Sequence, residues 1–297
     1  MPELPEVETI RADLDKVIVG KKIKNFEVLV SKTVRPQSVR KIKQDLIGAK
    51  IMAAKRRAKM LILSLDTKKH LLAHLKMTGQ LIYQRSKGET LRDPKVSPLI
   101  VGGHPQPNGH LNLPNKYTRA IFTFTDGSKL FFNDLRKFGW LRTTTQAELE
   151  EIVAKVGPEP LENDFTLPYF TSILKRYPNR PIKQTLLDQK LIAGIGNIYA
   201  DEAAFLANIL PSRKAGSLKP VEVANLYKNI IGVLKLAIKK KGTSSRNYRR
   251  VSGAEGGMVK HLKVYARGGQ PCLTCGTPLR KIRLASRGTH FCSKCQK

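Results

Sequence analysis

Apolar residues at the start of the chain repeat with the period of a helix. Val7, Ile10, Leu14 and Val17 lie three or four positions apart, and Gly20 ends the run. Short stretches rich in β-branched and aromatic residues follow and predict strands. These stretches cover residues 24–30, 51–54, 60–65, 71–75, 119–125 and 129–133. The first half of the chain is therefore predicted to form a β-sandwich or barrel with one N-terminal helix.

A proline-rich segment interrupts the predicted strands. Residues 85–116 contain five prolines and several glycines, a composition typical of loops. We expect a long surface loop there. Asp126-Gly127 lies between the last two predicted strands and indicates a hairpin.

The pattern changes to a helical period in the second half of the chain. Apolar residues recur at helical spacing over residues 147–156, 167–176, 182–191, 198–207 and 221–241. The whole is predicted to be an α+β protein of several domains. The domains are a β-sandwich over residues 1–145, a helical domain over 146–260 and a four-cysteine zinc ribbon over 261–297.

The charge indicates a polyanionic partner. Fifty-four Lys and Arg stand against 23 Asp and Glu, for a formal net charge of +31. Nucleic acid explains such a basic chain better than an anionic membrane surface does, because no basic amphipathic anchor or lipidation motif is present. The chain has no apolar run of membrane-spanning length, and its first residues are acidic, unlike a signal peptide. We expect a cytoplasmic protein.

The four cysteines have the spacing of a metal site. They form two Cys-x2-Cys pairs separated by sixteen residues: Cys272, Cys275, Cys292 and Cys295. This pattern predicts one structural Zn²⁺ bound by four thiolates. Two disulfides or four free thiols are the alternatives, and a cytosolic location disfavours the disulfides. No organic cofactor is expected.

A glycine-rich turn is a candidate phosphate site. Gly194-Ile195-Gly196-Asn197 lies between two predicted helices, where free backbone amides favour an anion. The Asn197 side chain adds a donor. An ordinary interhelical turn would have the same sequence, so the basic charge of the chain is what favours a phosphate.

Two further segments combine cations with bulky side chains at strand ends. Residues 74–79 contain His74 and Met77, and residues 133–140 contain Arg136 and Phe138. Arg and Phe at a loop tip can wedge into a base stack. The same apolar residues are equally consistent with core packing. The basic run 55–59, which ends at Lys59, is either a solvated face or a phosphate-binding one.

Position 2 carries distinctive chemistry. Removal of Met1 before Pro2 would leave a secondary amine, whose ordinary pKa near 8 keeps more of it neutral than a lysine amine. Attack on an aldehyde-level carbon would give an iminium ion, a good electron sink. Glu3, at the start of the first helix, could transfer protons nearby.

These motifs together resemble one family. Pro2–Glu8, Arg57–Lys59, His74–Gly79, Asp134–Gly139, Gly194–Tyr199 and the four cysteines follow each other as in the formamidopyrimidine-DNA glycosylases, bacterial DNA repair enzymes that excise 8-oxoguanine and have AP lyase activity. The resemblance spans residues 2–297. It implies a β-sandwich, a helix–two-turn–helix module and a zinc finger that bind double-stranded DNA containing oxidised bases or abasic sites. It also implies a monomer located with the nucleoid.

The resemblance assigns roles to single residues. It makes Pro2 the nucleophile at C1′ of the damaged nucleotide and Glu3 the acid and base, with strand cleavage by β- and then δ-elimination. Residues that hold phosphates around the flipped nucleotide are Lys59, His74, Asn197 and Arg287, of which Lys59 and Arg287 belong to the catalytic set. Residues that fill the gap left by the flipped base are Met77, Arg136 and Phe138, with Arg136 facing the orphaned cytosine.

Three departures from the family pattern bear on the preferred lesion, one of them the replacement of the family's usual His pair around Tyr117 and Arg119. Two other functions are alternatives. Residues 243–260 lack the Asp-Gly-Lys-Pro-Gly pattern that the family has where it closes over the base, and residues 93–115 are longer than expected. An endonuclease VIII-type enzyme for oxidised pyrimidines usually begins Pro-Glu-Gly-Pro and lacks the Met, Arg and Phe set. A non-catalytic zinc-ribbon DNA-binding protein would not need Pro2, Glu3 and Lys59.

Overall fold

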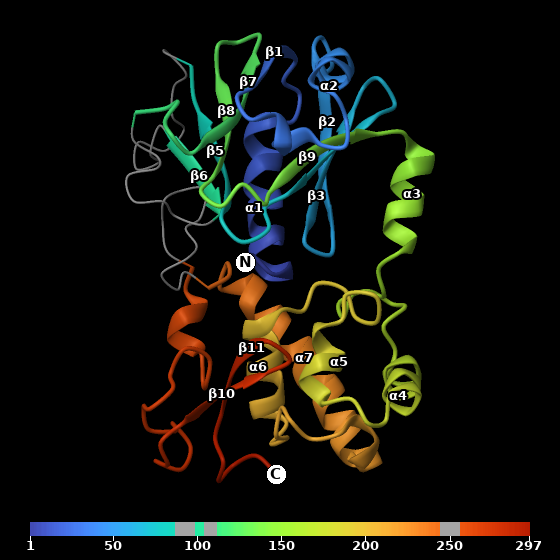
Figure 1. Cartoon of the computed structure of the whole chain (residues 1–297), viewed down its shortest axis with the longest axis vertical. Helices are drawn as coiled ribbons and strands as arrows, with labels where there is room; N and C mark the ends of the chain where they lie inside the picture. Colours follow the sequence, from blue (N-terminus) through green and yellow to red (C-terminus); the bar gives the residue numbers. More distant parts are fainter. Residues whose placement is uncertain (87–98, 104–111, 244–255) are drawn as a thin grey trace. The chain divides into compact units, whose positions relative to one another are not determined.

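The chain folds into two compact units (Figure 1). The computed structural model describes residues 1–86, 99–103, 112–243 and 256–297, the short second range by its backbone alone. Met1–Val153 and Lys240–Val259 form the first unit, and Ala154–Lys239 and Lys260–Lys297 form the second.

The first unit begins with the predicted helix, α1 (Leu4–Ile18). Glu3 and Glu6 form a capping box at its start, in which the Glu6 carboxylate accepts the backbone N–H of Glu3 at 3.0 Å. The apolar face at Val7, Ile10, Leu14 and Ile18 is buried in the core of the unit. The periodicity thus placed this helix correctly.

Two antiparallel sheets pack face to face in the first unit and confirm the β-sandwich. One has the strand order β1-β7-β8-β5-β6 and the other β2-β3-β4-β9. The strands are β1 (Ile23–Val28), β2 (Ile51–Arg57), β3 (Met60–Leu65), β4 (His70–His74), β5 (Gly79–Gln84), β6 (Leu99–Gly103), β7 (Thr118–Phe124), β8 (Lys129–Asp134) and β9 (Trp140–Thr144). One buried cluster takes side chains from both sheets, among them Leu63, Phe122 and Phe132.

A helix also covers the outer face of the smaller sheet. Met60, Ile62 and Leu72 point away from the central core and pack against α3 (Gln146–Ala154). Successive residues of a strand point to opposite faces, so β3 is apolar on both sides because both sides are covered.

Four of the α-helices and strands described in this unit were not predicted. These are α2 (Val39–Leu46), β5, β6 and β9. The prediction of an unbroken loop over residues 85–116 was wrong, because β6 lies within it and pairs with β5 over its whole length. Prolines flank this short apolar run, and an edge strand tolerates prolines beside it, so composition alone indicated a loop.

The second unit is helical, with a two-stranded ribbon. Its elements are α4 (Leu167–Arg176), α5 (Ile182–Leu187), α6 (Asn197–Leu206), α7 (Pro220–Lys239), β10 (Arg280–Leu284) and β11 (Arg287–Phe291). The predicted helix over 182–191 ends early, because residues after Leu187 form turns that lead into α6. The 3-10 turns among the described residues are η1 (Ser31–Val34) of the first unit, η2 (Ala215–Ser217) of the second, and η3 (Met258–His261), whose residues are divided between the two. No helix among the described residues has the length and apolar character needed to span a membrane.

Candidate functional site

The N-terminal residues are held in place from two directions. Pro2 and Glu3 are both buried, immediately before α1. The Glu6 carboxylate, which binds the N–H of Glu3, also accepts the N–H and hydroxyl of Thr243, at 2.8 and 3.0 Å. Gly242 has a φ of +76°, and a Cβ there would lie 2.9 Å from Glu6 Oε1. Position 3 is therefore fixed by one carboxylate that also fixes residue 243.

Lys59 lies in the tight hairpin between β2 and β3. Ala58 adopts the left-handed conformation with a φ of 52°, and its carbonyl accepts a hydrogen bond from Arg56 at 3.0 Å. Arg56 also forms an ion pair with Glu8 of α1 at 3.1 Å. The Lys59 side chain is buried. The first helix therefore fixes both the N-terminal residues and the turn that carries Lys59.

His74, at the end of β4, is a neutral hydrogen-bond donor. Its Nδ1 accepts the backbone N–H of Lys76 at 3.0 Å. Burial, aided by the charges of Lys76 and Lys59, lowers the pKa of His74 to about 3. Since Nδ1 is an acceptor and the ring is neutral, the proton lies on Nε2. An Nε2–H donor suits a phosphate oxygen.

Asp134 organises the loop that presents Arg136 and Phe138. Its Oδ1 accepts the Thr78 hydroxyl and the Arg136 N–H, the latter at 3.1 Å, and its Oδ2 accepts the Gly139 N–H at 2.7 Å. A Cβ on Gly139 would lie 2.7 Å from the ring of Phe132, so glycine is required there. The buried Asp134 thus joins two loops from different strands.

The two loops present their bulky residues differently. Phe138 is 47% exposed, with the Arg136 guanidinium 4.6 Å from its ring centre. Met77 is half-buried. Trp140 instead packs on the outer face of the smaller sheet. Of the two interpretations of these aromatic residues, core packing applies to Trp140, while the exposed Phe138 is available to a partner.

In the second unit, the side chain of Asn197 binds the backbone of the strand that begins with Arg287. Asn197 is the first residue of α6, and its side-chain amide donates to the carbonyl of Gly288 at 2.9 Å. Arg287, the neighbour of Gly288 at the start of β11, is exposed. The Gln189 side chain holds the preceding turn by bonding Gly194 N and Ile195 O, at 3.0 and 2.8 Å. The helix start and the ribbon therefore form one local site.

A buried ion pair supports this local site and was not predicted. Lys183 Nζ lies 2.6 Å from Asp201 Oδ1, and the two side chains are 1% and 0% exposed. The same Nζ donates to Gly288 O at 3.0 Å, and Asp201 Oδ2 accepts the N–H of His290 at 2.9 Å. Both ends of the pair thus bind the strand that begins with Arg287. A lysine at a helical position gives no sign in the sequence that it is buried.

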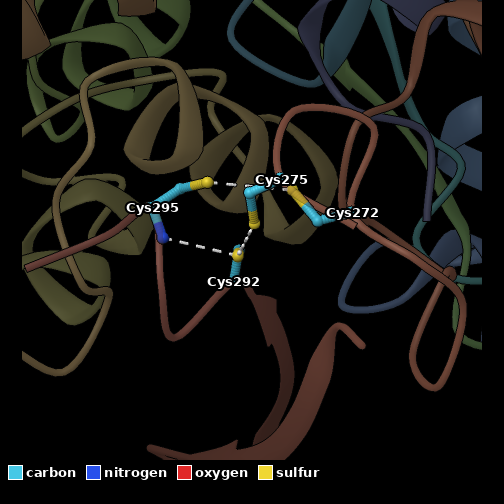
Figure 2. A group of neighbouring side chains, drawn as sticks. All are labelled: Cys272, Cys275, Cys292 and Cys295. Carbon is cyan, nitrogen blue, oxygen red and sulfur yellow. Dashed lines mark hydrogen bonds between the residues drawn. The ribbon is translucent and has the colours of Figure 1, made fainter. Parts of the chain in front are cut away.

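The four cysteines form the predicted metal centre (Figure 2). Their sulfurs all lie within 4.8 Å of one another, with Cys272–Cys295 at 3.9 Å and Cys275–Cys292 at 3.5 Å. Zinc–sulfur bonds of about 2.3 Å place the sulfurs of a tetrahedral site about 3.8 Å apart. The donors therefore fit Zn²⁺, and the sulfur separations exclude disulfides.

The zinc centre is packed against the helical part of its unit. Cys272 and Cys292 share a buried cluster with Phe205 of α6. The buried Glu202, also on α6, accepts three backbone N–H groups, from Lys263, Val264 and Tyr265, at 2.8 to 2.9 Å. Burial raises the pKa of Glu202 against the effect of those bonds. No local pattern in the sequence indicated a role for Glu202, Asp134 or Gln189.

Comparison with known families gives a consistent match along the chain. The model of the formamidopyrimidine-DNA glycosylase N-terminal domain matches residues 1–141, and that of the H2TH domain of the same enzymes matches residues 156–249. The model of a zinc finger found in FPG and IleRS matches residues 269–297.

Individual relatives match over their whole length. The formamidopyrimidine-DNA glycosylase of Carboxydothermus hydrogenoformans is 41% identical over 297 residues and covers all of both chains. That of Enterococcus faecalis is 39% identical over 298 residues, covering all of this chain and 97% of the relative. A Lactococcus lactis FPG mutant in complex with Fapy-dG containing DNA has a TM-score of 0.85 and 34% identity, with complete coverage of both chains. The Lactococcus lactis Fpg with abasic-site DNA gives a TM-score of 0.83, also at 34% identity, over 99% of each chain.

Proposed function

Since the chain belongs to the formamidopyrimidine-DNA glycosylase family, we propose that it excises oxidised purines from duplex DNA and then cuts the strand at the resulting abasic site. It is a DNA repair glycosylase with the lyase activity of its family. The observation that carries the proposal is the match to these enzymes over all of both chains. The fixed position of residues 2 and 3 before α1 supports it.

Pro2 acts as the nucleophile in this mechanism, after removal of Met1. Its secondary amine attacks C1′ of the damaged nucleotide, the glycosidic bond breaks, and the base leaves with the bonding electrons and a proton. The nitrogen then loses its proton, and its lone pair forms the C1′=N bond as the C1′–O4′ bond breaks and O4′ takes up a proton. The product is an iminium between Pro2 and the opened sugar.

Strand cleavage follows from the iminium. Loss of a proton from C2′ expels the 3′ phosphate, and a second elimination expels the 5′ phosphate. Glu3 is the group that moves protons at the sugar. Its backbone is held by Glu6, so its carboxylate starts from a fixed point.

The remaining site residues bind DNA in two groups. Lys59, His74, Asn197 and Arg287 hold the phosphates of the flipped nucleotide, and the Nε2–H of His74 suits that role. Met77, Arg136 and Phe138 occupy the space that the base leaves, and Arg136 faces the orphaned base. The four cysteines hold the structural zinc ion, which fixes the ribbon that carries Arg287.

The proposal also covers the oligomeric state of the enzyme, its location and the roles of its domains. The enzyme acts as a monomer in the bacterial cytoplasm, on nucleoid DNA. Residues 1–145, 146–260 and 261–297 serve as its catalytic, helical and zinc-finger domains. The unusual part of the 243–260 segment lies largely outside the described residues, so the preference among oxidised bases is a matter for assay.

Borohydride trapping tests the proposed function. The protein is incubated with an 8-oxoguanine·cytosine duplex or an abasic duplex and reduced, and mass spectrometry checks that Met1 is absent. A covalent adduct is expected on both. Pro2→Gly should lose at least about 100-fold in strand cleavage with DNA binding retained, while Pro5→Ala, a matched change in the same peptide, should not. No adduct on either duplex, with tight binding and a free Pro2, would contradict an enzymatic role.

A further inference from the structure

A basic pocket in the first unit lies beside the loops that carry Met77 and Phe138. Both residues line it, and its volume is about 500 Å³, within the range of sites that enclose a small ligand. The pocket has no acidic residue among its described lining residues. Five of its lining residues are cations: Lys32, Arg35, Lys76, Lys137 and Arg142. This concentration of charge favours a phosphate-bearing group.

The pocket wall is a built structure. Arg142 Nε donates to the carbonyl of Arg35 at 3.1 Å, which joins β9 to the segment after η1. The Arg142 guanidinium lies 4.5 Å from the ring centre of Trp140, whose ring lies 5.7 Å from that of His74. Trp140 in turn packs on the outer face of the smaller sheet. A merely solvated charge run would not have this support.

We propose that this pocket holds the sugar–phosphate backbone of the strand opposite the lesion. The inference rests on the proposed function, in which Arg136 faces the orphaned base. Phe138 lines the pocket, and the Arg136 guanidinium stacks on its ring. The nucleotides that flank the orphaned base therefore pass the mouth of the pocket.

The composition of the pocket fits this occupant. Its cations are separate from Lys59, His74, Asn197 and Arg287, which serve the damaged strand. Cations beside exposed aromatic faces are how proteins hold a nucleic acid backbone without reading its sequence. Lys32 and Arg35, for which the sequence predicts no role, thus become contacts to the intact strand.

Salt-dependent binding of duplex and single-stranded DNA tests the assignment. Both probes carry a stable tetrahydrofuran analogue of an abasic site, and affinity is measured by fluorescence anisotropy. The test variant is the double change Lys32→Ala and Arg35→Ala, at two exposed side chains. The control is Lys24→Ala with Arg40→Ala, which removes the same charge from exposed positions outside the pocket.

The expected result is a loss specific to the duplex. The test variant should bind the duplex at least about 10-fold more weakly than the control does, and its slope of log K against log salt should fall by about 1 to 2. Single-strand affinity should match the control. Because Trp140 is the only tryptophan, its emission should change more on duplex than on single-strand binding.

Two outcomes would overturn the proposal. Equal losses on both probes would assign the pocket to the damaged strand, and a duplex loss no larger than the control's would reduce it to general surface charge. Borohydride trapping on an abasic single strand separates this failure from a failure of the proposed function. The test variant should still be trapped there, whereas a parent protein that is never trapped would contradict the enzyme itself.

Discussion

The buried pair Lys183–Asp201 gives the sharpest prediction about stability. Changing Lys183 to Met removes the cation and leaves the Asp201 carboxylate, which is 0% exposed, without its charge partner. Breaking a buried pair in this way costs about 3 to 5 kcal/mol. The change also removes the hydrogen bond from Lys183 Nζ to the Gly288 carbonyl, which accepts the side-chain amide of Asn197 as well. We therefore expect weaker binding of abasic duplex, by about 10-fold, together with the lower stability.

The pair can be tested with a second change that removes the charge. In Lys183→Met with Asp201→Asn, the asparagine oxygen can still accept the N–H of His290, while no uncompensated charge stays buried. This double variant should recover at least about 2 kcal/mol relative to Lys183→Met. Urea unfolding of the zinc-loaded protein, followed by far-ultraviolet circular dichroism, measures both. A cost below about 1 kcal/mol for Lys183→Met, or a double variant less stable than the single one, would refute the reasoning.

Three further predictions concern the loops, the histidine and the metal. A Cβ on Gly79 would lie 2.4 Å from the carbonyl oxygen of Leu75, so Gly79→Ala should lower the free energy of unfolding by about 1 to 3 kcal/mol. A Cβ on Gly232 in α7 would meet open space, so Gly232→Ala should raise the free energy of unfolding by about 0.5 to 1 kcal/mol. Thermal unfolding measures both. The pKa of His74 is about 3 in the folded protein and 6.5 ordinarily, so the unfolded chain binds more protons between these values and stability falls as pH drops below 6.5. By pH 5 the parent should lose about 2 kcal/mol relative to His74→Gln in denaturant unfolding at the two pH values; a constant difference would show that His74 titrates normally. Chelation of zinc should abolish tight DNA binding, metal analysis should give one zinc per chain, and added Zn²⁺ should restore binding; retention of full affinity after complete removal would contradict a role for the metal in the site.

Local patterns allowed much of this structure to be predicted. The spacing of the four cysteines was sufficient for the metal centre, because two short knuckles bring the sulfurs together. The first helix followed from the period of its apolar residues and the glycine that ends the run. In both cases the residues that determine the structure are close together in the sequence, so a local pattern is enough to predict it.

Contacts between residues far apart in the sequence could not be predicted in this way. Lys183 and Gly288 are 105 positions apart, and a lysine on a helix is usually solvated. Asp134 is the last residue of β8 and Thr78 directly precedes β5, so the pairing of these two strands decides that they meet. The basic pocket depends on Arg35 and Arg142 for the same reason. Tertiary pairing, which no local pattern encodes, determines such contacts.

The single carboxylate of Glu6 has a consequence for the order in which the protein is made. It binds residue 3 and residue 243, the latter 237 positions further along the chain. The ribosome adds residues one at a time and domains fold as they emerge, so the contact between Glu6 and Thr243 cannot form until residue 243 has been made. A nascent or truncated chain that stops before Thr243 would thus carry an incompletely fixed Pro2 and Glu3. Complete fixation of the two residues proposed for the chemistry therefore waits until synthesis has passed residue 243.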